Sequence, residues 1–173
     1  MRPAVAALLK RLQSTSASKN DAILPIALLL ERSTRWGYTD ASHERELPRE
    51  LLDSALSDAE HREIVHALGR AILREPENGS IHWALGKAKW EEGMGVLLRT
   101  LATRGDGIGD EPAYQAIIAL ENFLIADEGR LLVGVQQEIE ASDPRPFLES
   151  CLLSSHPRLS VLSRRLLARI ARG

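Results

Sequence analysis

The sequence predicts an all-α protein, and three observations lead to this prediction. Aromatic residues make up only 4% of the chain while hydrophobic residues reach 44%, so Leu, Ile, Val and Ala must build the core, as suits helix packing. No segment alternates β-branched and polar residues as a strand does. The phrase Ala-Leu-Gly-(Arg/Lys)-Ala occurs at residues 67–71 and again at 84–88, on successive predicted helices. Such recurrence is typical of stacked helical repeats, which here predict a right-handed α-α superhelix of about four helix pairs.

Apolar periodicity and capping residues place the individual helices. We expect helices over residues 3–13, 20–35, 48–56, 58–74, 80–92, 93–104, 112–127, 130–141, 144–154 and 157–170. Pro3 suits the first turn of the first helix, where its missing N–H is not needed. Asn20 or Asp21 is expected to cap the second helix, and Ser57 or Asp58 the fourth.

Turn and loop residues separate the predicted helices in the second half of the chain. Residues 75–79 (Glu-Pro-Glu-Asn-Gly) end one helix, and Ser80 is expected to cap the next. The glycine-rich residues 105–110 are expected to form a loop, because neither a strand before them nor a Gly-Lys-Ser/Thr after them indicates a nucleotide cradle. No segment resembles an interdomain linker, so residues 1–173 are expected to form one domain.

Charge is strongly segregated although the net charge is only −2. Residues 106–143 carry nine acidic and one basic side chain, whereas residues 144–173 carry six basic and one acidic. Two interpretations remain open: solvated helix faces, or a polarised docking surface that steers a charged partner. The acidic centre favours a basic protein partner and makes duplex nucleic acid an unlikely ligand, since DNA-binding domains are typically net basic.

Cysteine usage and hydropathy bear on the compartment. Cys151 is the single cysteine, so no disulfide forms within the chain and a reducing compartment is expected. The apolar run in residues 1–13 is too short for a signal peptide, and residues 22–30 span about half a membrane. These features predict a cytoplasmic protein without membrane segments. The amphipathic last helix needs either a cap or a second subunit, so a homo-oligomer through this helix is one of two alternatives that stay open.

The residues around the second repeat phrase carry a family resemblance. Residues 84–101, with Leu97, Leu98 and Leu101 after the Ala-Leu-Gly-Lys phrase, resemble HEAT-like repeats of the kind first noted in phycobilisome lyases. Residues 146–170 fit the same pattern, so the resemblance covers residues 80–173 and extends more loosely over 1–79. Leu159-Ser160 replaces the Val-Arg that such repeats favour, and Gly95 replaces a common proline. The resemblance implies a helical solenoid with a binding role and transfers no catalytic residue.

Two tryptophans are the sharpest local feature. Trp83 and Trp90 are seven residues apart, so on one continuous helix they share a face. Either this helix is buried on two sides, or the tryptophans project as interface anchors. In the family arrangement, residues 93–104, 130–141 and 144–154 would line the concave side. The expected partner contacts are Trp83, Trp90, Glu92, Arg99, Arg130, Gln136, Gln137 and Glu140.

Other chemical groups give no catalytic or metal site. His61 and His66 lie five apart and do not converge on a helix, whereas helical zinc pairs lie four apart. His82 is expected at the surface, His156 as a helix cap, and Cys151 as a small buried side chain.

The sequence thus predicts a non-enzymatic adaptor or inhibitor, without cofactor, that binds a protein on its concave face. The alternative is a nucleic-acid-binding or DNA-repair protein, because some HEAT-like proteins resemble alkylpurine glycosylases with Trp and Asp on a basic concave face. A bilin-lyase-like enzyme is a third possibility, for which the chain offers no nucleophile or pigment motif.

Overall fold

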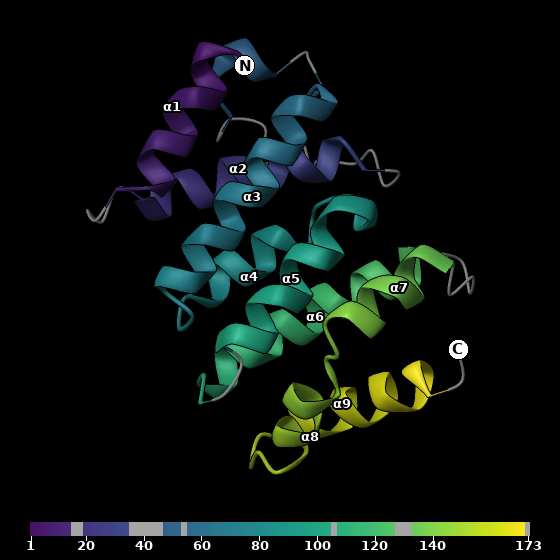
Figure 1. The fold of residues 1–173 in the computed structure, drawn as a ribbon. Helices are drawn as coiled ribbons and strands as arrows, with labels where there is room; N and C mark the ends of the chain where they lie inside the picture. Colours follow the sequence, from purple (N-terminus) through teal and green to yellow (C-terminus); the bar gives the residue numbers. More distant parts are fainter. Residues whose placement is uncertain (15–18, 35–46, 53–54, 105–106, 127–132, 172–173) are drawn as a thin grey trace.

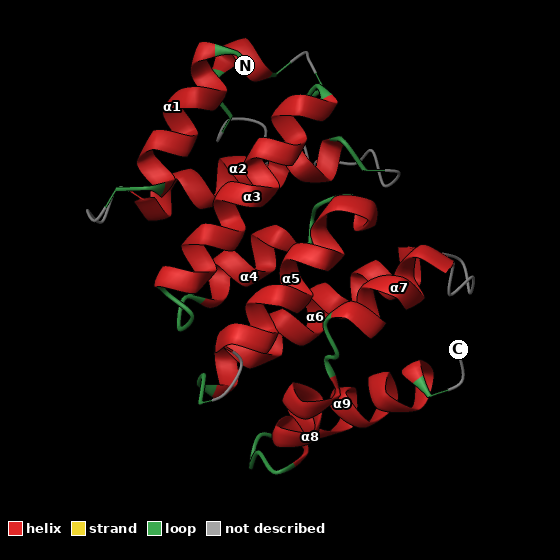
Figure 2. Cartoon of the chain, viewed as in Figure 1, coloured by secondary structure: helices red, strands yellow, loops and turns green. Residues whose placement is uncertain are grey.

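The computed structural model describes residues 1–14, 19–34, 47–52, 55–104, 107–126 and 133–171. Within these ranges every regular element is a helix, which confirms the all-α prediction (Figure 2). The helices are α1 (Pro3–Leu12), α2 (Asn20–Arg32), the 3-10 helix η3 (Arg49–Leu51), α3 (Asp58–Arg74), α4 (Gly79–Leu85), α5 (Trp90–Arg104), α6 (Asp110–Ala126), α7 (Val133–Ala141), α8 (Arg145–Leu152) and α9 (Pro157–Ile170).

Alternate helices lie side by side (Figure 1). In one row α1 contacts α3, α3 contacts α5 and α5 contacts α7; in the other, α2 contacts α4, α4 contacts α6 and α6 contacts α9. The rows are joined because α1 packs on α2, α3 on α4 and α5 on α6, while α8 packs on α9. One cluster of buried apolar side chains extends from Val5 in α1 to Ile170 in α9. Each helix therefore covers an apolar stripe on its neighbours that none would bury alone.

The glycines of the two repeat phrases lie where neighbouring helices approach closely. A Cβ added at Gly69 of α3 would lie 2.5 Å from the Cγ1 atom of Val96 in α5. A Cβ added at Gly86, after α4, would lie 2.7 Å from the Cβ and 2.8 Å from the Cα of Ala119 in α6. The glycine of each phrase thus allows contact with the next helix in the same row, where a larger side chain would collide.

The predicted helix over residues 80–92 is wrong, because α4 ends at Leu85 and α5 begins at Trp90. The intervening turn tightens through bonds from the N–H of Lys87 to the carbonyl of Ala84 (3.1 Å) and from the N–H of Ala88 to that of Leu85 (3.0 Å). These bonds span three residues rather than four, which ends the α-helical ladder. Trp83 and Trp90 therefore lie on different helices, and the seven-residue spacing does not place them on one face.

The structure confirms the predicted caps of α3 and α9 but not those of α2 and α4. Ser57 caps α3 in a full capping box, and the His156 ring accepts a bond from the N–H of Leu159 at the start of α9; both caps are confirmed. Ser80 lies inside α4, which follows Asn78 without a side-chain cap. The helix over residues 20–35 also lacks a side-chain cap and ends at Arg32, and only the 3-10 turn Arg49–Leu51 occupies the region 48–56 where a longer helix was expected.

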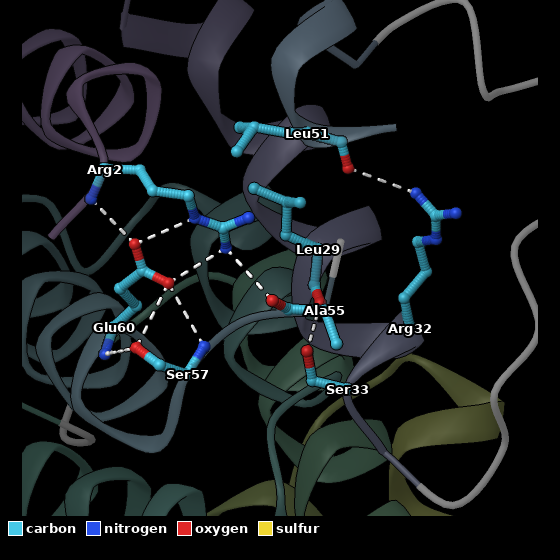
Figure 3. A network of polar contacts seen from close by, with 8 residues as sticks. All are labelled: Arg2, Leu29, Arg32, Ser33, Leu51, Ala55, Ser57 and Glu60. Atoms are coloured by element: carbon cyan, nitrogen blue, oxygen red, sulfur yellow. Dashed lines mark hydrogen bonds and ion pairs between the residues drawn. The ribbon is translucent and has the colours of Figure 1, made fainter. Parts of the chain in front are cut away.

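The Ser57 capping box extends into a polar network that ties α1 to α3 (Figure 3). Glu60 is 5% exposed, and its Oε1 atom accepts bonds from the backbone N–H (2.8 Å) and Nε (3.0 Å) of Arg2. Its Oε2 atom accepts from Nη2 of Arg2 (2.9 Å) and from the N–H of Ser57 (3.1 Å). These bonds, with that of Arg2 foremost, lower the pKa of the Glu60 carboxyl to about 2.

Replacing Glu60 with glutamine is expected to lower the free energy of unfolding by about 1–2 kcal/mol, because a neutral amide meets the donors of Ser57 and Arg2 with one oxygen only. Urea denaturation followed by circular dichroism at neutral pH measures this loss. Glu63→Gln is the matched control. Glu63 is exposed, and its ion pair with Arg70, at 3.6 Å between Oε1 and Nη2, lies at the surface, where such pairs contribute little to stability. Equal losses in both variants would contradict a structural role for the Glu60 network.

Candidate binding site

A pocket of about 520 Å³ opens where the end of α2, the turn between α4 and α5, and α6 meet. Its wall combines apolar and polar side chains, among them Ala88, Trp90, Phe123, Glu31, Lys87 and Asn122. Phe123 is 1% exposed and belongs to the core, so the pocket reaches the hydrophobic interior. This size and this mixture are typical of sites that enclose an apolar group and orient it with a few polar contacts.

The Lys87 ammonium lies at the edge of this pocket between two groups that attract a cation. Its Nζ atom is 2.8 Å from Oε1 of Glu31 and 5.5 Å from the ring centroid of Trp83. The side chains of Lys87 and Glu31 remain 24% and 26% exposed, so the pair faces solvent in part. Charge attraction and the electron-rich indole face both stabilise an ammonium here.

On its other side, the turn between α4 and α5 is hydrogen-bonded to His61 of α3, which is fully buried. The Nε2 atom of His61 accepts a bond from the backbone N–H of Lys89 (3.2 Å), so Nε2 carries no proton. The Nδ1 atom therefore holds the proton and donates it to the Glu92 carboxylate. The Nζ atom of Lys89 also pairs with Asp58 of α3 at 3.0 Å. Since both ring nitrogens are engaged, His61 acts as a structural connector in this arrangement.

His82 contradicts its predicted surface position, because it is 1% exposed. Its Nε2 atom lies 3.0 Å from the carbonyl oxygen of Pro76 and therefore donates, while Nδ1 is buried without a hydrogen-bond partner. Burial lowers the pKa of His82, and burial is likewise the main cause that lowers the pKa of His61. Burial thus favours the neutral form of both rings.

The predicted partner contacts separate into different environments. Trp90 lines the pocket, Trp83 packs half-buried against the core, and Glu92 is engaged by His61. Arg99 of α5 is exposed and lies 3.8 Å from Glu138 of α7.

Two further predicted contacts, Gln137 and Glu140, are exposed on α7. Arg130 and the side chain of Gln136 lie outside the described residues. α5 contacts α7, and α8 packs on α9. Of the predicted contacts, Trp90 thus lines the pocket, whereas Arg99, Gln137 and Glu140 are exposed on α5 and α7.

Sequence reasoning missed Glu31, Lys87 and Asn122 as parts of the pocket. Glu31 and Lys87 are 56 residues apart, and Asn122 belongs to a third helix. No local motif links these positions. The one available signal was the break-prone Gly86 between the two tryptophans, which also lines the pocket.

Cys151 is buried, as predicted, and burial raises the pKa of its thiol. We expect a disulfide reagent such as DTNB to react with the native protein at mildly alkaline pH at least about a hundredfold more slowly than with the denatured chain. Absorbance of the released thiolate follows the reaction. Equal rates in the two states would contradict the buried position.

Comparison with protein-family models, with curated proteins and with solved structures finds no significant match. In the described part of the chain, no helix is both long and apolar enough to cross a membrane. Among the same residues, no group of three or more His, Cys, Asp or Glu side chains is placed to hold a metal ion.

Proposed function

We propose that this chain is a HEAT-like helical-repeat module, cytoplasmic and non-enzymatic, that binds a protein partner. The helix pairs α1/α2, α3/α4, α5/α6 and α8/α9 would form the four repeats of a right-handed superhelix. The contacts of alternate helices within each row support the stacking of α1/α2, α3/α4 and α5/α6, and the contact between α6 and α9 supports that of the fourth pair.

The observation that carries the binding role is the pocket at the turn between α4 and α5. Its apolar wall reaches the core side chain Phe123, and Trp90 stands at its edge only partly buried. Partly exposed tryptophan beside a preformed hollow is typical of interface anchors. His61, His156 and Cys151 support a non-catalytic role, since the two rings accept structural bonds and the thiol is buried.

Affinity capture followed by reconstitution tests this function. A tagged wild-type chain is used to capture partners from the source cells, and the enriched protein is then purified and titrated by calorimetry. We expect binding to fall at least about tenfold in Trp90→Ala, because an interface anchor is removed. Glu91→Arg is a second variant that changes the exposed pocket edge without removing packing. Arg158→Ala, at an exposed position of α9, is expected to bind as wild type.

The opposite pattern of losses would contradict the assignment of the interface to the pocket. Loss of binding in Gln137→Ala and Arg99→Ala, with Trp90→Ala and Glu91→Arg unchanged, would place the partner on the α5–α7 row. Salt-dependent retention of duplex DNA at physiological ionic strength would instead favour the nucleic-acid alternative.

A further inference from the structure

Lys87 occupies a site built for a cation. Its ammonium sits between the Glu31 carboxylate, 2.8 Å away, and the Trp83 ring, whose centroid is 5.5 Å away. The site is preformed by two different helices, since Glu31 belongs to α2 and Trp83 to α4. Lys87 itself comes from the turn that follows α4, and it reaches the site with an unbranched, flexible side chain.

An arginine would satisfy this site better than the lysine does. A guanidinium stacks its plane on an indole and binds a carboxylate through two parallel N–H bonds, whereas an ammonium acts as a point charge. The Lys87–Glu31 pair also keeps about a quarter of each side chain exposed, so the lysine ammonium can turn into solvent when a competing arginine from another molecule takes its place.

The pocket beside the cation site provides the rest of a recognition surface. Its apolar wall includes Phe123 and Ala88, which suits one large apolar side chain. In the part of the chain that the structure describes, the Asn122 side chain makes no hydrogen bond and Glu91 no ion pair, so an amide and a carboxylate at the pocket are available.

We propose that the pocket binds a partner segment in which an arginine stands beside a large apolar residue. The arginine displaces Lys87 from between Glu31 and Trp83, and the apolar side chain enters the pocket against Phe123. Lys87 thus competes with the partner's arginine for Glu31 and Trp83 and thereby lowers the affinity for the partner. This inference rests on the proposed binding function and specifies the chemistry of the partner.

Two dipeptides that differ only in charge test the proposal. N-acetyl-Phe-Arg-amide and the neutral isostere N-acetyl-Phe-citrulline-amide are titrated into isotope-labelled protein, and the indole N–H resonances of Trp83 and Trp90 are followed by NMR. In Lys87→Met, which keeps the apolar stem, the arginine dipeptide is expected to bind about tenfold more tightly than in wild type. The citrulline dipeptide is expected to bind both proteins equally.

A double variant completes the test. Adding Glu31→Gln to Lys87→Met is expected to remove the tenfold gain, because the carboxylate that pairs with the guanidinium is lost. Equal affinity of wild type and Lys87→Met for the arginine dipeptide would overturn the proposal. So would an equal gain for the citrulline dipeptide, because Lys87 would then obstruct the pocket by bulk alone.

The dipeptide titrations and the capture experiment can fail independently of each other. Capture of a protein that depends on Trp90, together with dipeptides that show no preference for arginine, would retain the function and refute the arginine site. An arginine preference without any captured protein would establish the site and refute the function.

Discussion

Gly86→Ala is expected to lower the free energy of unfolding by about 3 kcal/mol. The added Cβ would lie 2.8 Å from the Cα of Ala119, a backbone atom that cannot rotate away, so α4 and α6 would have to separate. Alanine also restricts the unfolded chain, which favours folding by about 0.4–1 kcal/mol where the backbone is compatible, as it is at Gly86 with φ of −64°. The collision is the larger effect. Thermal and urea denaturation followed by circular dichroism measure the difference.

Gly69→Ala is the matched comparison, because it changes the other repeat phrase in the same way. Its new Cβ meets only a side-chain methyl of Val96, which moves more readily than backbone, so a loss of about 1 kcal/mol is expected. Combining Gly86→Ala with Ala119→Gly should recover part of the loss, since the collision with the methyl group disappears but the collision with the backbone of residue 119 remains. A loss at Gly86 no greater than that at Gly69 would contradict the close approach of α4 and α6.

The sequence was informative wherever the interactions are local. The capping box of α3 lies within four residues, from Ser57 to Glu60, and apolar spacing located most of the helices. The recurring phrases indicated close packing, and their glycines do lie where neighbouring helices approach. Local patterns report such features because capping and periodicity act over one or two helical turns.

The errors arise where distant residues decide the conformation. The end of α4 at Leu85 is supported by the bond from the N–H of Lys89 to His61, which is 28 residues earlier, and Gly86 is only a weak local signal of it. Similarly, His82 closely follows the polar turn of residues 75–80 and looks like a surface residue, yet α2, α3 and α6 all pack on α4. The pocket depends on a pair 56 residues apart, Glu31 and Lys87, so its position follows from the packing and not from a motif.

Acidification from pH 7 to pH 5 is expected to destabilise the protein through His61 and His82. Burial holds the pKa of each below the ordinary value of 6.5, so between the folded and unfolded pKa values the unfolded chain binds more protons. Stability is therefore fully present above about pH 6.5 and is lost as the pH falls below it. Each histidine contributes a slope of at most about 1.4 kcal/mol per pH unit.

The geometry around His61 explains why protonation is unfavourable despite nearby carboxylates. Glu92 and Asp58 favour the charged ring, while Lys89 and burial oppose it, and burial is the largest of these effects. A proton on Nε2 would also face the N–H of Lys89, so the bond that anchors the turn to α3 would be replaced by a repulsive contact. Acid therefore weakens the wall of the pocket as well as the fold.

Replacing His61 and His82 with side chains that do not ionise measures the contribution of each histidine to the pH dependence of stability. His61→Gln retains an amide that can donate to Glu92 and accept from Lys89, and the double variant His61→Gln/His82→Gln removes both ionisable rings. Urea denaturation at half-unit steps from pH 5 to 8 should show a pH slope that falls in the single variant and falls further in the double variant. The titration of Glu60 does not interfere, because its folded pKa of about 2 and ordinary value of 4.5 place its effect below this range. A double variant with the full wild-type slope would show that other groups cause the acid sensitivity.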